Sequence, residues 1–188
     1  MAPNTNKDPA DNKDSADNKR HQQPTAQGAD IEQLKAQFLN LQFDTKDFVL
    51  DAQKLQIAAQ MSGETQPRFC DPTDPDFQAL PGYIASLAAG RHLPVDFPRL
   101  GGIPMDGGKA VTCHAPVRAG IKLTGNTHLH DIYDKQGRSG RMLFLVSRME
   151  IFDEAGTHLA SSDSRMVCLL YTSPSPRDLS TSRMPSSA

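Results

Sequence analysis

Between residues 110 and 167 the sequence is a succession of β-rich segments separated by short turn sequences. β-branched and apolar residues dominate these segments or alternate with polar ones, as in strands, and Gly, Asp and Pro punctuate them. The predicted strands are residues 110–117, 121–133, 141–152 and 158–167, with turns at 134–137 and 153–156. Because connections this short join antiparallel neighbours, the pattern predicts an antiparallel meander.

Helical patterns precede this meander. Apolar residues at helical spacing predict a short helix over residues 31–41, followed by an extended segment. Asp51 is a candidate N-cap, and Gly63 a C-terminal stop, for an amphipathic helix between them. A further helix, built mostly of small side chains that suit close packing inside a curved sheet, is predicted over residues 83–90. Helices followed by antiparallel strands predict an α+β protein.

Length, charge and cysteine content exclude several classes. A chain of 188 residues with 37% hydrophobic residues fits one domain with polar ends. With a formal net charge of −2, the chain lacks the positive charge typical of nucleic-acid-binding domains. No apolar run is long enough to span a bilayer. The N-terminus lacks an apolar signal segment, so we expect a soluble cytoplasmic protein with reduced thiols. Cys70, Cys113 and Cys168 lack the spacing of metal ligands, so no metal site is predicted, and Cys70 and Cys113 are expected to be buried.

The two ends of the chain are expected to lie outside the domain. Residues 1–28 contain no large aliphatic side chain after Met1, which predicts a disordered tail. Residues 168–188 resemble, codon by codon, the translation of a transposase adapter and a flow-cell primer used in short-read sequencing. We therefore expect residues 29–167 to form the domain, residues 168–188 to be a non-native tail, and the native continuation after Val167 to be missing.

Four sequence motifs point to a family. They are Gly-Glu-Thr-Gln-Pro-Arg at residues 63–68, Met-Asp-Gly-Gly-Lys-Ala-Val at 105–111, His-Asp-Ile-Tyr-Asp-Lys at 130–135 and Gly-Arg-Ser-Gly-Arg-Met at 137–142. With them the stretch from residue 43 to 167 resembles the MaoC-like dehydratases, in particular their diverged N-terminal type, the FAS1-like dehydratase domain. The resemblance implies a hot-dog fold, in which a curved antiparallel sheet wraps around a central helix.

The resemblance also locates the expected chemistry. Active MaoC-like members carry Gly-Asp-x-Asn-Pro-x-His-x-Asp after the first helix, and the Asp and His together activate water for addition to a 2-enoyl thioester. Glu64 stands at the position of that Asp and Phe69 at the position of that His. Because a phenyl ring transfers no proton, the pair is incomplete, and no catalytic residue is assigned. Asp71 is expected to cap a turn.

The implied role is therefore that of a diverged half. Such a half shapes the acyl-thioester tunnel of a hydratase or dehydratase of fatty acid metabolism, and turnover depends on an active hot-dog partner, either a fused domain or another subunit of a homo- or hetero-oligomer such as a dimer. The resemblance implies a CoA or acyl-carrier-protein thioester as ligand and no cofactor. Arg68, Arg118 and Arg138, with Arg141 near the same turn as Arg138, are candidates for contacts to the thioester's phosphates.

Two alternatives remain open. The chain could be a self-sufficient hydratase that uses Glu64 with another imidazole such as His114, or a non-enzymatic acyl-CoA binding module. His128 and His130 alternate on one predicted strand and could bind a metal, but no third ligand accompanies them. A polar strand face is the preferred interpretation of that pair, and a hydrogen-bonded strand residue that of His114.

Overall fold

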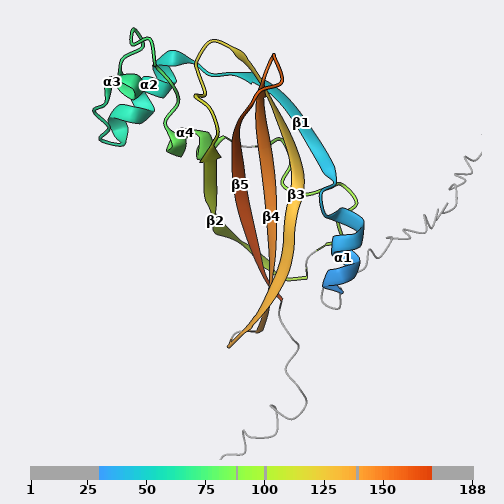
Figure 1. The fold of residues 1–188 in the computed structure, drawn as a ribbon. Coiled ribbons are helices and arrows are strands. Elements are labelled where there is room, and N and C mark those ends of the chain that lie inside the picture. Colours follow the sequence, from blue (N-terminus) through green and yellow to red (C-terminus); the bar gives the residue numbers. More distant parts are fainter. Residues whose placement is uncertain (1–29, 88, 100, 139, 171–188) are drawn as a thin grey trace, which may run out of the picture.

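A five-stranded antiparallel sheet forms the body of the protein (Figure 1). The computed structural model describes residues 30–87, 89–99, 101–138 and 140–170. The strand order is β1-β3-β4-β5-β2, and the strands are β1 Gln42–Val49, β2 Ile103–Cys113, β3 Lys122–Gly137, β4 Gly140–Asp153 and β5 His158–Leu170. The predicted α+β class and antiparallel pairing are confirmed. The tail predicted over residues 1–28 lies outside the described residues.

Four short helices accompany the sheet: α1 Ile31–Phe38, α2 Ala52–Met61, α3 Pro67–Cys70 and α4 Pro81–Ser86. In Figure 1, α2 and α3 gather at one end of the sheet, α4 lies beside β2, and α1 lies beside β1 and β3. The predicted N-cap is confirmed, since the Asp51 carboxylate accepts a hydrogen bond of 2.9 Å from the backbone N–H of Lys54. Gly63 follows the helix with φ of 72°, the left-handed conformation that glycine adopts at little cost.

The helix predicted over residues 83–90 is shorter than expected. It ends at Ser86, and Leu87 is already extended, with φ −63° and ψ 132°. The backbone N–H of Gly90 donates instead to the Asp44 carboxylate on β1, at 2.6 Å. A hydrogen bond to the sheet thus replaces the helical one. The chain that follows α4, residues 89–92, crosses the sheet and is called the strap below.

The predicted turn at residues 134–137 is wrong. These residues continue β3, which pairs with β4 as far as Gly137 and Gly140. Stacked rings of Tyr133 and Phe144, 4.7 Å apart, and a 2.6 Å ion pair between Asp134 and Arg141 stabilise the extended hairpin. The predicted turn after Asp153 is confirmed, because Asp153 accepts from the N–H groups of Gly156 and Thr157.

One face of the sheet, the inner face, carries two apolar clusters. Buried and less buried residues alternate along β3, so its buried side chains share this face. The first cluster joins α2 and α4 to the sheet through buried side chains that include Leu55, Ile84, Leu123 and Ile151. The second joins α1 to the other end through Leu34, Phe38, Leu129, Leu143 and Cys168.

The C-terminal strand extends past the boundary expected from the sequence. β5 continues to Leu170, and the side chains of Cys168 and Leu170 are buried, opposite Leu143 and Arg141 of β4. The first three residues of the adapter-like segment therefore complete the strand, because β4 offers them a pairing edge. Residues 171–188 lie outside the described part of the chain. Cys113, expected to be buried, is exposed.

Truncation of Ile151 tests the packing of the first cluster. Its side chain is 0% exposed, so Ile151→Ala removes buried methyl groups and leaves a cavity. We expect the free energy of unfolding to fall by about 2–5 kcal/mol in urea denaturation. Ile57→Ala on the open face of α2, where the side chain is 53% exposed, is the matched control and should change it by less than about 0.5 kcal/mol. Equal losses in the two variants would contradict this packing.

Candidate functional site

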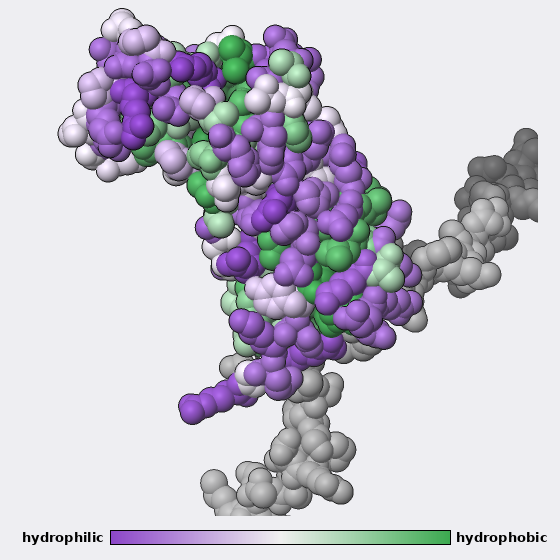
Figure 2. Space-filling view, viewed as in Figure 1, coloured by the Kyte–Doolittle hydropathy of each residue, from purple (hydrophilic) through white to green (hydrophobic). Residues whose placement is uncertain are grey.

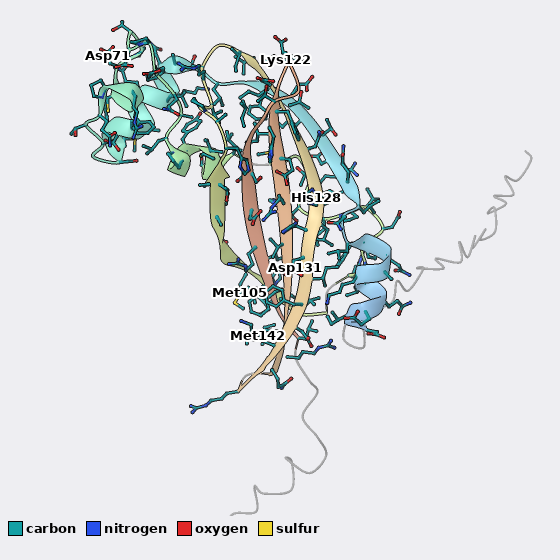
Figure 3. All side chains as sticks on the ribbon, viewed as in Figure 1. Asp71, Met105, Lys122, His128, Asp131 and Met142 are labelled. Carbon is teal, nitrogen blue, oxygen red and sulfur yellow. The ribbon has the colours of Figure 1, made fainter. Side chains whose placement is uncertain are left out.

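The loop with the expected catalytic positions lies at the helical end of the molecule. It follows α2, contains the short helix α3 and ends near Asp71, far from the middle of the sheet (Figure 3). The Gln56 side chain on α2 donates a 3.0 Å hydrogen bond to the carbonyl of Cys70, which fixes the end of the loop. Asp71 accepts from the backbone N–H and hydroxyl of Thr73 and so caps the next turn, as predicted.

The carboxylate of Glu64 is engaged within its own loop. One oxygen accepts hydrogen bonds from the backbone N–H groups of Thr65, at 2.8 Å, and Gln66, at 3.0 Å. These bonds, that of Gln66 first, hold the pKa of Glu64 below its ordinary value. The carboxylate is therefore ionised at neutral pH and serves as a cap at the entry to α3.

Phe69 is packed rather than reactive. Its side chain is 9% exposed, and the guanidinium of Arg68 lies over the ring at 4.8 Å from its centroid. The ring offers no proton to transfer. Arg68 itself is exposed, with its cationic group directed over this ring.

The imidazoles lie elsewhere. His114 is 3.2 Å from the hydroxyl of Ser161, and its ring centroid is 4.3 Å from that of His158, which pairs with Glu150 at 2.7 Å. Ser161 and Glu150 oppose each other on β5 and β4 and alternate with the inner-face residues, so this cluster belongs to the outer face. His114 is thus hydrogen-bonded as predicted, and Glu64 has no imidazole among its hydrogen-bond partners in the described residues.

The paired histidines of β3 lie close to each other on the strand. His128 and His130 have ring centroids 5.6 Å apart, and His130 lies at a register shift between Leu129 and Asp131. Across the described residues, no group of three or more His, Cys, Asp or Glu side chains is arranged to hold a metal ion. Burial lowers the pKa of His128.

The candidate arginines do not converge. The guanidinium of Arg118 donates to the carbonyl of Pro75 at 2.6 Å and pairs with Asp76 at 3.3 Å, near the helical end. Arg138 is exposed at the β3–β4 hairpin, at the opposite end of the sheet (Figure 1). The 16 residues of β3 separate them, a span of about 50 Å at roughly 3.3 Å per residue. Arg141, beside that hairpin, pairs with Asp134.

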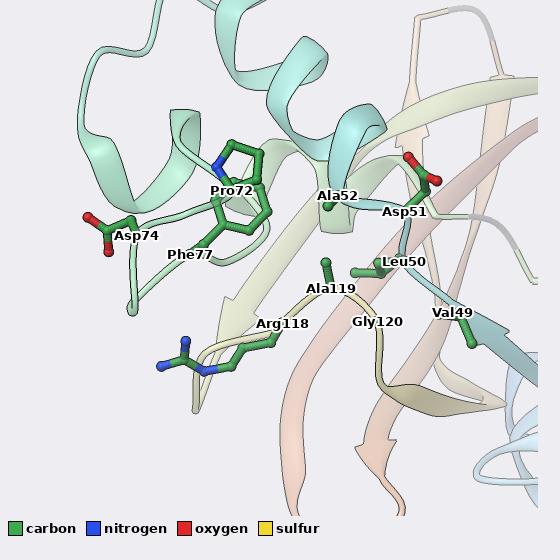
Figure 4. A pocket seen from close by; sticks show the side chains of 10 residues that line it. All are labelled: Val49, Leu50, Asp51, Ala52, Pro72, Asp74, Phe77, Arg118, Ala119 and Gly120. Atoms are coloured by element: carbon green, nitrogen blue, oxygen red, sulfur yellow. The ribbon is translucent and has the colours of Figure 1, made fainter.

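The largest described cavity, of about 680 Å³, opens beside Arg118. Figure 4 shows Leu50 and Ala52 facing Ala119 within it, with Arg118 and Asp74 on the side away from Val49. Three further cavities lie along the inner face, with volumes of about 150, 30 and 320 Å³. None of the four is lined by Glu64, Arg68, Phe69 or Arg138.

These cavities form a row because neighbours share lining residues. The first and second share three residues, Val49, Leu50 and Asp51. The second and third share Leu87 and Met149, and the third and fourth share His92, Lys109 and Ser164. The row crosses the inner face from the start of α2 to the edge strand β2, beneath the strap that follows α4. Its elongated course suits a flexible chain rather than a compact ligand.

A band of hydroxyl groups interrupts the apolar inner face where the row is narrowest. The hydroxyl band consists of Thr127, Ser147, Ser162 and Ser164, all lining the 30 Å³ cavity. None of these residues was predicted from the sequence to belong to a site. The sequence shows these Ser and Thr residues within the predicted strands. Which of them face inward is known only from the register of the strands.

The face of the protein shown in Figure 2 is mostly polar. Hydrophilic residues predominate on the face seen in Figure 2, and hydrophobic ones gather in patches over the sheet. Among the described residues, no helix has the length and apolar character needed to cross a membrane.

Comparisons with known proteins agree with this architecture. A family model for the FAS1-like, dehydratase domain region matches residues 37–162. No curated protein sequence matches the chain. A MaoC-like dehydratase from Phytophthora capsici superposes with a TM-score of 0.55 at 23% identity, over 73% of this chain and 50% of that one. The chain thus spans about half of that protein.

Two complexes from Mycobacterium tuberculosis are also similar in structure. HadBC, a 3R-hydroxyacyl-ACP dehydratase, gives a TM-score of 0.53 at 16% identity, covering 69% of this chain and 96% of that one. The ChsH1–ChsH2 complex gives a TM-score of 0.52 at 16% identity, covering 77% of this chain and 92% of that one. At such identities the likeness establishes the fold alone, and the expected hot-dog fold is confirmed.

The titration of Glu64 tests the geometry of the loop. Because its pKa is lowered in the folded protein, the carboxylate should titrate below the ordinary range of glutamate in a carbon-detected NMR titration. The ionised Glu64 carboxylate stabilises the folded protein at pH values above its unfolded-state pKa. This stabilisation is lost as the pH falls through its folded-state pKa. Gln66→Pro removes the N–H that lowers the pKa most, at a residue whose φ of −70° proline can adopt, so the pKa of Glu64 should rise. An unchanged titration in this variant would contradict the capping arrangement.

Proposed function

Because the chain belongs to the FAS1-like dehydratase domain region family, we propose that it is the diverged half of an enoyl-thioester hydratase or 3-hydroxyacyl-thioester dehydratase. In this role it binds and shapes the acyl group, and an active hot-dog partner performs the proton transfers. The ligand is the thioester of CoA or of acyl-carrier protein.

The observation that carries the proposal is the buried ring of Phe69 at the position of the proton donor. Addition of water to an enoyl thioester needs one group that removes a proton and another that supplies one. Glu64 is held by two amides of its own loop, and the imidazole of His114 lies with Ser161 on the outer face. A self-sufficient hydratase built on Glu64 and His114 therefore finds no support in the geometry.

The row of cavities supports a binding role. Its members are lined by apolar side chains such as Leu50, Leu87 and Met149, as expected where an acyl chain is sheltered from water. Arg118 stands at the open end, where a cation would meet the phosphates of CoA. Arg138 is too distant to share in this contact and is not part of the proposal.

The edge strand β2 supports a partner. β2 pairs with β5 alone, and its apolar side chains Ile103 and Met105 are 52% and 44% exposed. An unpaired, apolar strand edge invites pairing with another chain. Two structural neighbours, HadBC and ChsH1–ChsH2, were themselves solved as complexes. We therefore place the active half in a homo- or hetero-oligomer with this chain.

Hydration of crotonyl-CoA tests the division of labour. The purified chain should show no turnover above the uncatalysed rate, because the proton-transfer pair is incomplete. Turnover should appear on co-expression with the product of an adjacent gene that carries the Asp and His of the active motif, and Glu64→Gln in this chain should leave it within about twofold. The rate is followed by loss of the enoyl-thioester absorbance.

Two outcomes would contradict the proposal. Turnover by this chain alone that Glu64→Gln abolishes would make it an enzyme in its own right. A complex that forms but hydrates no enoyl thioester would favour a non-enzymatic acyl-CoA binding module. Gln33→Ala on the exposed side of α1, away from both the loop and β2, is a control for general effects of substitution in the complex.

A further inference from the structure

The narrowest cavity of the row contains a polar group without a partner. The hydroxyl of Thr127 is buried, the side chain being 2% exposed, and it has no hydrogen-bond partner among the described residues. Thr127 lines the 30 Å³ cavity together with Ser162, 6% exposed, and Ser147, 9% exposed. Buried hydroxyls normally find partners, so this one indicates something that the cavity receives.

The register explains why the hydroxyl groups converge. Thr127 on β3 pairs with Met149 on β4, which pairs with Ser162 on β5. In a neighbouring set of cross-strand partners, Ser147 on β4 pairs with Ser164 on β5, which pairs with Lys109 on β2. Both sets of side chains face inward, so the hydroxyl band crosses β3, β4 and β5 between the two apolar clusters. An acyl chain that follows the row of cavities must pass this band.

The strap above the band is hydrogen-bonded to the sheet on either side of the cavity. The N–H of Gly90 donates to Asp44 at 2.6 Å, and the hydroxyl of Ser147 donates to the carbonyl of His92 at 2.7 Å. Ser147 is thereby already satisfied, whereas Thr127 is not. The volume exceeds the roughly 10–15 Å³ that one water requires, so an oxygen-bearing group fits and a ring does not.

We propose that the hydroxyl band selects acyl thioesters that carry an oxygen function, a hydroxyl or keto group, on the chain where it passes Thr127. The inference rests on the proposed function and deepens it. A ligand oxygen at this point pairs with the Thr127 hydroxyl, whereas a methylene leaves that hydroxyl buried and unpaired. Sites built to hydrogen-bond a ligand oxygen discriminate strongly against analogues that lack it.

Binding of two acyl-CoA series to the full chain tests the inference. Hexanoyl-, octanoyl- and decanoyl-CoA are compared with their ω-hydroxy counterparts by calorimetry, so that the terminal oxygen reaches successively deeper positions. We expect the ω-hydroxy compound to bind about 3- to 10-fold more tightly than its alkyl match at one chain length, the size of one net hydrogen bond. The other lengths should show a smaller preference or the reverse.

Substitutions at Thr127 test whether its hydroxyl causes the preference for ω-hydroxyacyl chains. Thr127→Val keeps the shape and removes the hydroxyl, so it should abolish the preference without weakening the binding of the alkyl series. Thr127→Ser keeps the hydroxyl and should retain it. Thr124→Val, on the opposite face of the same strand, is the matched control and should change nothing in either series.

The outcomes separate the inference from the function on which it rests. Saturable binding of both series with equal affinity at every length, or a preference that survives Thr127→Val, would overturn the inference alone. A Thr127→Val variant that is no more stable and unchanged in selectivity would mean that the hydroxyl is already satisfied by water, and would overturn it too. If neither series binds saturably, the proposed function fails and the inference fails with it.

Discussion

The alternation of side chains along the central strands is the constraint on which the rest of the structure depends. Because successive residues of a strand face opposite ways, β3, β4 and β5 present one inner face with two apolar clusters and the hydroxyl band between them. The helices can then bury their apolar sides only at the two ends of that face. The middle is left to the strap, which hydrogen bonds from Gly90 and Ser147 fasten to the sheet.

This division separates the cavities from the loop in which the family's active members perform their chemistry. Glu64 and Phe69 lie at the far end of α2, where a carboxylate is tied to its own backbone and a ring is packed under Arg68. The cavities begin at the other end of α2 and follow the inner face. Under the proposed function, the cavities hold the acyl group and the partner supplies the proton transfers.

Local signals in the sequence were sufficient where local chemistry decides. The Asp51 cap and the turn after Asp153 follow from side-chain hydrogen bonds to nearby amides, and both were predictable. Features that depend on pairing between distant residues were not. The early end of α4 depends on Asp44, the long β3–β4 hairpin on contacts across the two strands, and the last residues of β5 on the edge of β4. Thr127 could be recognised only from the register, since a threonine in a strand sequence can lie on either face.

Amide hydrogen exchange with and without octanoyl-CoA tests most directly whether an acyl group lies along the inner face. The account predicts slower exchange at residues 89–92 of the strap and at the β3 amides around Thr127 when the ligand is bound. It predicts little change at residues 64–71. Slower exchange confined to residues 64–71, with the strap unaffected, would contradict it.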